Sequence, residues 1–190
     1  MKLGILGGTF NPVHLGHLLI AQDALEQLGL DRVLFIPAAT PPHKTPDRLA
    51  AGKHRWAMVQ LAIRGNRQFA ADNLELRRGG RSYSVDTLTI LRRRQPDAEF
   101  YFIIGADSLP ELHRWRAIHR LARLCQFAVA ARPGCGIRPP RAPVRWVTVA
   151  GHPCAISSTE IRERVASGRS IRYLVPEMVR RYILVNGLYR

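Results

Sequence analysis

The sequence predicts an α/β fold in which helices cover both faces of a parallel sheet. The first observation is an apolar run at 3–6, an amphipathic stretch at 15–28 and a second apolar run at 33–36. A strand, a helix and a strand at this spacing form a βαβ unit, which requires parallel strands and a right-handed crossover. The second observation is two further buried runs, at 100–104 and 127–131. The third is length, because 190 residues with 46% hydrophobic content can bury one full core.

The first thirty residues predict a strand, a glycine turn and a helix. The strand at 3–6 leads into a turn at Gly7-Gly8, and Asn11-Pro12 bends the chain before a helix that begins near Leu15. Gly29 ends this helix, because glycine readily adopts the left-handed conformation found after helix C-termini. The apolar face of the helix consists of Leu18, Leu19, Ala21, Leu25 and Leu28.

The next segments predict a loop, a helix, a short strand and another helix. The proline-rich stretch 37–46 predicts a loop, because proline lacks a backbone donor. A helix is expected over 53–63, and the alternation over 68–76 favours a short strand that ends before Gly79-Gly80. Ser84 is expected to cap a further helix. The expected core residues of the two helices are Trp56, Val59, Gln60 and Ile63, then Val85, Leu88 and Leu91.

The second half of the chain predicts three more strands. The run at 100–104 ends at Gly105, and the run at 127–131 is a further buried strand. A loop rich in proline, glycine and arginine follows over 132–143, and a short strand returns at 144–149.

Two helices complete the expected fold. Ser157 and Glu160 match the S-x-x-E capping box, so a helix begins there. The last helix begins at Pro176 and ends at Gly187, with Val179, Ile183 and Val185 on its apolar face. The whole predicts a Rossmann-like, doubly wound parallel sheet with helices on both faces and a small C-terminal helical portion, in a single domain over 1–190.

Composition narrows the class of protein. No apolar run is long enough to cross a bilayer, and the N-terminus enters a strand without a signal-peptide pattern, so a cytoplasmic protein without a membrane partner is expected. The cysteines at positions 125, 135 and 154 are odd in number and lack C-x-x-C spacing. They predict neither a disulfide framework nor a zinc site.

The net charge of +15 raises the alternative of a nucleic-acid-binding protein. The arginines are dispersed, however, and no helix-turn-helix, zinc finger or aromatic RNA-binding signature accompanies them. We therefore expect a solvated basic surface that attracts small polyanions, with no specific nucleic-acid partner.

A phosphate site is predicted where the first strand meets the first helix. The glycines let the backbone approach a ligand, and the free N–H groups of a helix start favour an anion. His14 and His17 are three residues apart across that helix start, so both rings can face one phosphate. Glycine pairs after a first strand are common, but this stretch has neither the P-loop ending nor G-x-G-x-x-G spacing. Histidines in place of a lysine favour nucleotidyl transfer over kinase chemistry.

A second phosphate-binding stretch is predicted at 156–162. The capped helix start exposes the amides and hydroxyls of Ser158 and Thr159, and Arg162 follows one turn later. A polyphosphate bound there would require 156–162 and His14-to-His17 to converge in space.

Other polar groups are expected at the carboxyl edge of the sheet, where open α/β sheets bind ligands. His43 and Lys44 lie on the 37–46 loop, although a solvated basic loop explains them equally well. Asp107 follows the strand at 100–104 and can accept bonds from ribose hydroxyls, and Trp115 suits either the core or stacking on a flat ring.

Two motifs together resemble the nucleotidyltransferase superfamily with H-x-G-H and S-S/T-x-I-R signatures. These are GGTFNPVHLGH at 7–17 and ISSTEIR at 156–162. Within it, the chain is similar to bacterial nicotinate-nucleotide adenylyltransferases over nearly its whole length. The other matching pieces are PPHK at 41–44, SYSVDTL at 82–88, G-x-D-x-L-x-x-L-x-x-W at 105–115 and YLVPEMVRRYI at 173–183.

The resemblance implies transfer of AMP from ATP to nicotinate mononucleotide, giving nicotinate adenine dinucleotide and pyrophosphate, with Mg²⁺ bound mainly through the ATP phosphates. It implies catalytic roles for His14, His17, Ser158 and Arg162. The implied ATP-binding residues are Gly8, Thr9, Phe10, His14, His17, Gly105, Asp107, Ser157, Ser158 and Arg162. The implied nicotinate mononucleotide-binding residues are Lys44, Tyr83, Ser84, Asp107, Trp115 and Arg132. Two positions depart from the family pattern: Ser84 replaces a frequent threonine, and Arg116 stands where some relatives have an aromatic residue.

Three alternatives remain at this stage. The acceptor could be nicotinamide mononucleotide or phosphopantetheine, although the PPHK loop and the Trp115 segment favour a phosphate and a flat ring. A nucleic-acid-binding protein that reuses the fold is the non-enzyme alternative, and fold alone does not separate the two. The sequence also leaves a homo-oligomer open.

Overall fold

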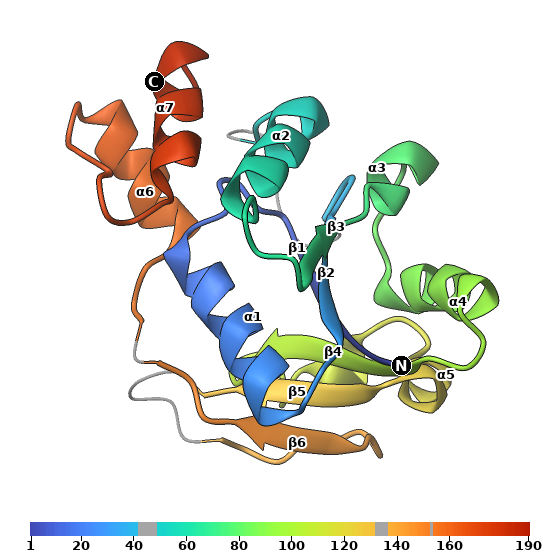
Figure 1. The fold of residues 1–190 in the computed structure, drawn as a ribbon. Coiled ribbons are helices and arrows are strands. Elements are labelled where there is room, and N and C mark those ends of the chain that lie inside the picture. The colour runs from blue at the N-terminus through green and yellow to red at the C-terminus, as the bar shows by residue number, and fades with distance from the viewer. Residues whose placement is uncertain (42–48, 132–136, 153) are drawn as a thin grey trace.

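The computed structural model describes residues 1–41, 49–131, 137–152 and 154–190 (Figure 1). Within these residues, six strands form one parallel sheet in the order β3-β2-β1-β4-β5-β6. The strands are β1 (Lys2–Gly8), β2 (Arg32–Pro37), β3 (Phe69–Ala71), β4 (Glu99–Gly105), β5 (Gln126–Ala130) and β6 (Trp146–Val149). The helices are α1 (Leu15–Gln27), α2 (Gly52–Ala62), α3 (Leu74–Arg78), α4 (Ser84–Arg94), the 3-10 turn η1 (Leu112–Arg114), α5 (Ile118–Leu124), α6 (Ser158–Ala166) and α7 (Glu177–Val185).

Side chains along the central strands point alternately to the two faces of the sheet, so a separate core forms on each face. Phe100, Phe102 and Ile104 of β4 face one core, whereas Tyr101 and Ile103 face the other. The first core is completed by α3, α4 and α5, and the second by α1, α2, α6 and α7 (Figure 1). A sheet covered on both faces needs apolar side chains in both directions, which explains the continuous apolar runs of β1, β4 and β5. The predicted doubly wound α/β fold is confirmed.

The strand order places a topological switch point between β1 and β4. The chain moves outward from β1 through β2 to β3, returns to β4 on the other side of β1, and continues to β6. Connections on the two sides leave the sheet in opposite directions, so a crevice opens at the carboxyl ends of β1 and β4. The residues predicted to bind phosphate follow β1 directly.

The C-terminal helices lie against the start of α1. The N–H of Leu15 donates to the carbonyl of Leu174 over 3.1 Å, and Ile161, Val179 and Ile183 are fully buried in the second core. Figure 1 shows α6 and α7 at the end of the molecule where α1 begins, with α7 beside α2. None of the helices in these described ranges is long and apolar enough to cross a membrane.

Several local expectations are wrong. Gly7 and Gly8 belong to β1, and the turn comes later, at 11–12. The strand expected over 68–76 is confined to Phe69–Ala71, and the last residues of that range belong to α3, which begins at Leu74. The capping residue of α4 is Tyr83, without a side-chain hydrogen bond, and Ser84 is the first helical residue.

The predicted helix faces are also wrong in part. Gln60 is exposed on α2, where Arg55 is buried instead, and Val185 on α7 is 85% exposed. The helix α5 has no counterpart in the prediction. Short helices such as α3 and α5 depend on packing against the sheet, which local patterns do not contain.

The close approach of β1 to its neighbours predicts a cost for Gly4→Ala. A Cβ at Gly4 would lie 2.8 Å from Leu30 Cδ1 and 3.1 Å from Ile103 Cδ1. We expect the substitution to lower the free energy of unfolding by about 1 to 3 kcal/mol through overpacking. Gly7→Ala on the same strand is the control, because its Cβ would meet Phe102 at an ordinary 3.5 Å. Equal urea midpoints for the two variants would contradict this account.

Candidate active site

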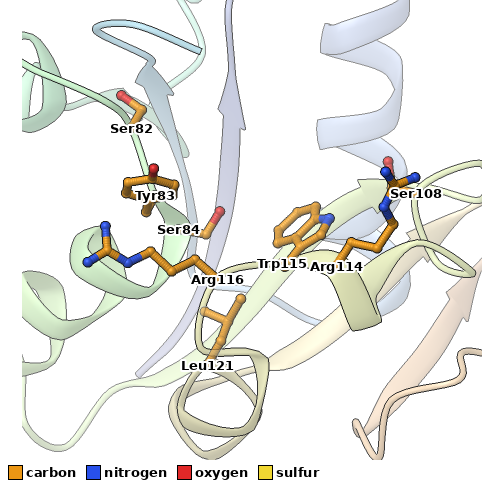
Figure 2. A pocket seen from close by; sticks show the side chains of 8 residues that line it. All are labelled: Ser82, Tyr83, Ser84, Ser108, Arg114, Trp115, Arg116 and Leu121. Carbon is orange, nitrogen blue, oxygen red and sulfur yellow. The ribbon is translucent and has the colours of Figure 1, made fainter. Parts of the chain in front are cut away.

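The crevice at the switch point consists of two adjoining compartments. The first, about 440 Å³, lies over the carboxyl ends of β1 and β4 and is lined by Gly8, Thr9, His17 and Gly105 among others. The second, about 500 Å³, lies between the start of α4 and the segment at 108–121 (Figure 2). Both are lined by Ser82, Ser84, Ser108 and Trp115, so the two compartments share a wall. A ligand with two linked halves can occupy both.

The two histidines meet at the start of α1. Their ring centroids are 3.7 Å apart, and His17 lines the first compartment while His14, 6% exposed, lies buried beside it. The backbone N–H of His14 donates to His17 Nδ1 over 3.2 Å. This bond makes Nδ1 the acceptor, so the neutral ring carries its proton on Nε2. His17 is thereby prepared to donate a hydrogen bond.

Small and aromatic neighbours hold this histidine pair in place. A Cβ at Gly16 would lie 3.1 Å from His14 Nδ1 and 3.2 Å from Cys154 Sγ, so the glycine between the histidines leaves the space that their packing requires. Phe10, 1% exposed, meets His17 edge to face with centroids 5.1 Å apart. The side chain of Phe10, predicted to bind ATP, therefore supports His17 from the core.

The segments at 7–17 and 156–162 lie side by side, as the predicted polyphosphate site requires. Ser158 Oγ donates to the carbonyl of Pro12, and Arg162 Nη1 donates to the carbonyl of Asn11, both over 2.9 Å. Ser157 caps α6 as predicted, since its Oγ accepts from the N–H of Glu160 over 3.1 Å. The positive start of α6 and a guanidinium thus lie against the bend before α1. Together they favour an anion at this place.

Arg55 is a site-supporting residue that the sequence analysis missed. Its side chain is 1% exposed, and its guanidinium donates to the carbonyls of Thr9, Ala38, Ala39 and Ala50 over 2.6 to 3.1 Å. Burial lowers the pKa of Arg55 from its ordinary value, and these four carbonyls compensate for the lost hydration. Nothing in the pattern of α2 distinguishes this arginine from the exposed basic residues around it.

The second compartment combines aromatic walls with cations. Trp115 is half-buried and meets Phe102 edge to face with centroids 5.9 Å apart, so it contributes to both the core and the pocket. The guanidinium of Arg116 lies 4.4 Å from the centre of the Tyr83 ring, and Figure 2 shows it extending toward that ring. A hydrogen bond from Arg81 and the nearby Arg116 lower the pKa of Tyr83. The compartment suits a flat ring that carries negative charge.

The other residues predicted from the sequence have fewer described contacts at the site. Asp107 follows β4 at the carboxyl edge as expected, and its side chain is exposed. The described residues include Pro41 of PPHK but not Pro42, His43 or Lys44, and they do not include Arg132. Ser82 and Ser108, which line both compartments, were not predicted, because serines near turns carry no distinguishing pattern. Within the ranges that the structure describes, no group of three or more His, Cys, Asp or Glu side chains could hold a metal ion.

The fold and the crevice define an α/β nucleotide-binding protein, and comparisons with known proteins specify it further. The family model described as cytidylyltransferase-like matches residues 5–164. Proteins with the name "Probable nicotinate-nucleotide adenylyltransferase" match the full chain. The one from Thermomicrobium roseum is 46% identical with 92% of its own length covered, and the one from Exiguobacterium sibiricum is 47% identical with 99% covered.

A solved structure shows the same fold at lower identity. The nicotinic acid mononucleotide adenylyltransferase of Plasmodium falciparum, complexed with NaAD, superposes with a TM-score of 0.82 at 18% identity, covering 99% of this chain and 97% of that one. The chain belongs to the cytidylyltransferase-like family and, within it, to the nicotinate-nucleotide adenylyltransferases.

The four bonds of Arg55 predict that its loss destabilises the protein. Arg55→Met would leave buried carbonyls without donors, and we expect the free energy of unfolding to fall by about 3 kcal/mol. Lys53→Met is the matched control on α2, because Lys53 is exposed and its loss should change stability by less than about 0.5 kcal/mol. Denaturant unfolding measures both variants. A value for Arg55→Met as small as that of the control would show that the guanidinium is dispensable.

Proposed function

We propose that this protein transfers AMP from ATP to nicotinate mononucleotide and releases pyrophosphate, which forms nicotinate adenine dinucleotide in NAD biosynthesis. The observation that carries the proposal is that Ser158 and Arg162 reach the bend at 11–12, which leads to His17 on the wall of a two-compartment crevice. The names of relatives that match the whole chain at 46 to 47% identity support the same reaction.

The chemistry needs alignment and charge neutralisation more than a strong base. The acceptor phosphate is already anionic near neutral pH, and one of its oxygens attacks the α-phosphorus of ATP. A new P–O bond forms as the bond between the α-phosphorus and the bridging oxygen breaks, and pyrophosphate leaves on the opposite side. Holding two anions in line is therefore the main task of the protein.

The phosphate end of the crevice supplies the required donors. His17 donates from Nε2 to the triphosphate as charge shifts toward the leaving group, and His14 supports the same charge from beside it. Arg162 and the start of α6 at Ser157 and Ser158 receive the pyrophosphate. The backbone at Gly8 and Thr9 lets the nucleotide approach β1, and Gly105 and Asp107 face its ribose from the end of β4. Mg²⁺ would be held mainly by the phosphates of ATP, whose negative charge it would help to neutralise.

The other compartment holds the pyridine nucleotide. Trp115 offers a face for the pyridine ring, and the start of α4 at Tyr83 and Ser84 presents amides to its carboxylate. The resemblance to the family adds Lys44 and Arg132 to the residues proposed to bind this nucleotide. Cationic Arg114 and Arg116 favour nicotinate over the neutral nicotinamide, and a compartment with Trp115 and Tyr83 suits a ring better than the flexible chain of phosphopantetheine.

The setting of the reaction completes the proposal. A cytoplasmic location is proposed, where ATP and pyridine mononucleotides are available. Specific nucleic-acid binding is not part of the proposed function, because the basic charge of +15 has no accompanying recognition motif. Assembly into a homo-oligomer stays a prediction.

The roles at the phosphate end predict large losses of turnover. His17→Ala and Arg162→Ala should each reduce kcat roughly 10²- to 10³-fold, because each removes a preorganised donor to the shifting charge. Pyrophosphate release measures turnover, and circular dichroism checks that the fold remains. His119→Ala and Arg123→Ala are the controls, since both residues are exposed on α5. Turnover within tenfold of wild type in His17→Ala or Arg162→Ala contradicts the assigned roles.

The cationic lining of the second compartment predicts a change in acceptor preference. Arg116→Gln should lower the ratio of kcat/KM for nicotinate mononucleotide over nicotinamide mononucleotide about tenfold, because one charge-assisted hydrogen bond contributes roughly 1.5 kcal/mol. Arg120→Gln, an exposed arginine on α5, is the control. Initial rates with both mononucleotides decide the point, and an unchanged ratio removes Arg116 from the recognition of the carboxylate.

A further inference from the structure

The end of the chain reaches the bend that carries the phosphate-binding histidines. Tyr189, the residue before the last, donates its hydroxyl hydrogen to Asn11 Oδ1 over 2.9 Å. The two residues are 178 positions apart in the sequence. This contact joins the C-terminus to the stretch between β1 and α1, and the resemblance of the two phosphate-binding motifs does not include it.

Asn11 is a junction between three segments of the chain. Its side-chain oxygen accepts from Tyr189 and also from the backbone N–H of Ala50, over 3.0 Å. Its backbone carbonyl accepts from Arg162 over 2.9 Å. The same residue thus connects the C-terminus, the segment before α2 and the guanidinium at the phosphate end. Asn11 is itself 6% exposed, so these bonds are shielded from water.

The chain turns back at the end of α7 to make this contact possible. Gly187 has a φ of +58°, and the N–H of Leu188 donates to the carbonyl of Ile183 over 3.0 Å, which is the Schellman pattern at a helix end. Tyr189 then adopts a φ of +68°, a left-handed conformation that is uncommon for a residue with a side chain. Such a conformation persists where surrounding contacts hold it.

The surroundings of Tyr189 make its hydroxyl a donor. Burial raises the pKa of Tyr189, and the nearby Arg162 and Arg55 oppose that rise only in part. The phenol therefore keeps its proton at physiological pH. A protonated hydroxyl aimed at the amide oxygen also fixes which end of the Asn11 side chain faces the tyrosine.

We propose that Tyr189 is a positioning residue for the phosphate end of the site and acts through Asn11. Its hydroxyl fixes the Asn11 side chain by a hydrogen bond and thereby fixes the backbone at 11–12. The carbonyls of this backbone accept the hydrogen bonds of Arg162 and Ser158. Release of the hydroxyl lets the bend move, and Arg162 moves with it. Because small displacements of aligned groups are costly in transfer reactions, the effect appears mainly in turnover.

The test compares Tyr189→Phe with Tyr182→Phe. Tyr182 is the matched control, because its hydroxyl also joins the C-terminal region to another segment, at His54 Nδ1 over 3.0 Å, without touching Asn11. The full-length variants are assayed for kcat and KM by pyrophosphate release, for affinity toward α,β-methylene-ATP by calorimetry, and for Tm. This inference rests on the proposed function for its kinetic readout, whereas the affinity for the analogue does not depend on the acceptor.

We expect Tyr189→Phe to lower kcat about tenfold and to lower the affinity for α,β-methylene-ATP about threefold. The KM for nicotinate mononucleotide should stay within about twofold of wild type. Tyr182→Phe should keep all three within about twofold while losing a similar amount of Tm. A purely structural role would instead make both variants lose activity in proportion to their stability.

A double substitution tests the route through Asn11. In an Asn11→Ala background, Tyr189→Phe should cause no further loss of kcat, because both changes remove the same bond. Additive losses of kcat in the double variant overturn the inference. A kcat and an analogue affinity of Tyr189→Phe within twofold of wild type overturn it as well. A wild-type protein that releases no pyrophosphate with either pyridine mononucleotide defeats the proposed function, and the affinities of Tyr189→Phe and Tyr182→Phe for the analogue then decide the inference alone.

Discussion

The site depends on two hydrogen bonds that join the bend after β1 to the start of α6. Ser158 donates to the carbonyl of Pro12 and Arg162 to that of Asn11, across 146 and 151 positions of sequence. Neither donor binds a side chain there, so the backbone path of the bend decides where both donors lie. Contacts that fix the backbone at 11–12 therefore also position the Arg162 guanidinium and the start of α6. Ala50 and Tyr189 both donate to Asn11, and Arg55 donates to nearby Thr9, so these contacts hold the same stretch of backbone.

Cations are used in two different ways around the crevice. Arg55 is buried, donates to four carbonyls and shapes the loops at Thr9 and at 38–39. Arg116 lines the second compartment, and Arg162 lies against the bend at Asn11, before the histidines; we propose that each binds an anion. His17 complements them as a donor, because the backbone bond to its Nδ1 leaves the proton of the neutral ring on Nε2. Most of the remaining arginines are exposed and contribute to the general positive potential of the surface.

The switch point opens the crevice in which we propose that two nucleotides meet in line. Opposite crossovers on the two sides of β1 and β4 open the crevice, and the shared wall at Ser84, Ser108 and Trp115 divides it into two compartments. One compartment has backbone, histidine and a nearby guanidinium, while the other has aromatic faces and arginines. We propose that a triphosphate and a charged ring bind on opposite sides of the shared wall, an arrangement that transfer between two nucleotides requires.

The sequence alone determined the α/β class, the positions of the main strands along the chain, the capped start of α6 and the candidate residues His14, His17, Ser158 and Arg162. These follow from local periodicity, capping and short motifs, which neighbouring residues encode. Only the tertiary structure decided that Arg55 is buried, that Tyr189 reaches Asn11, and that 74–78 is a helix. Their partners lie far away in the sequence, and helical spacing treats Arg55 and exposed Lys53 alike. The physical reason is that burial and hydrogen-bond partners are properties of the assembled fold.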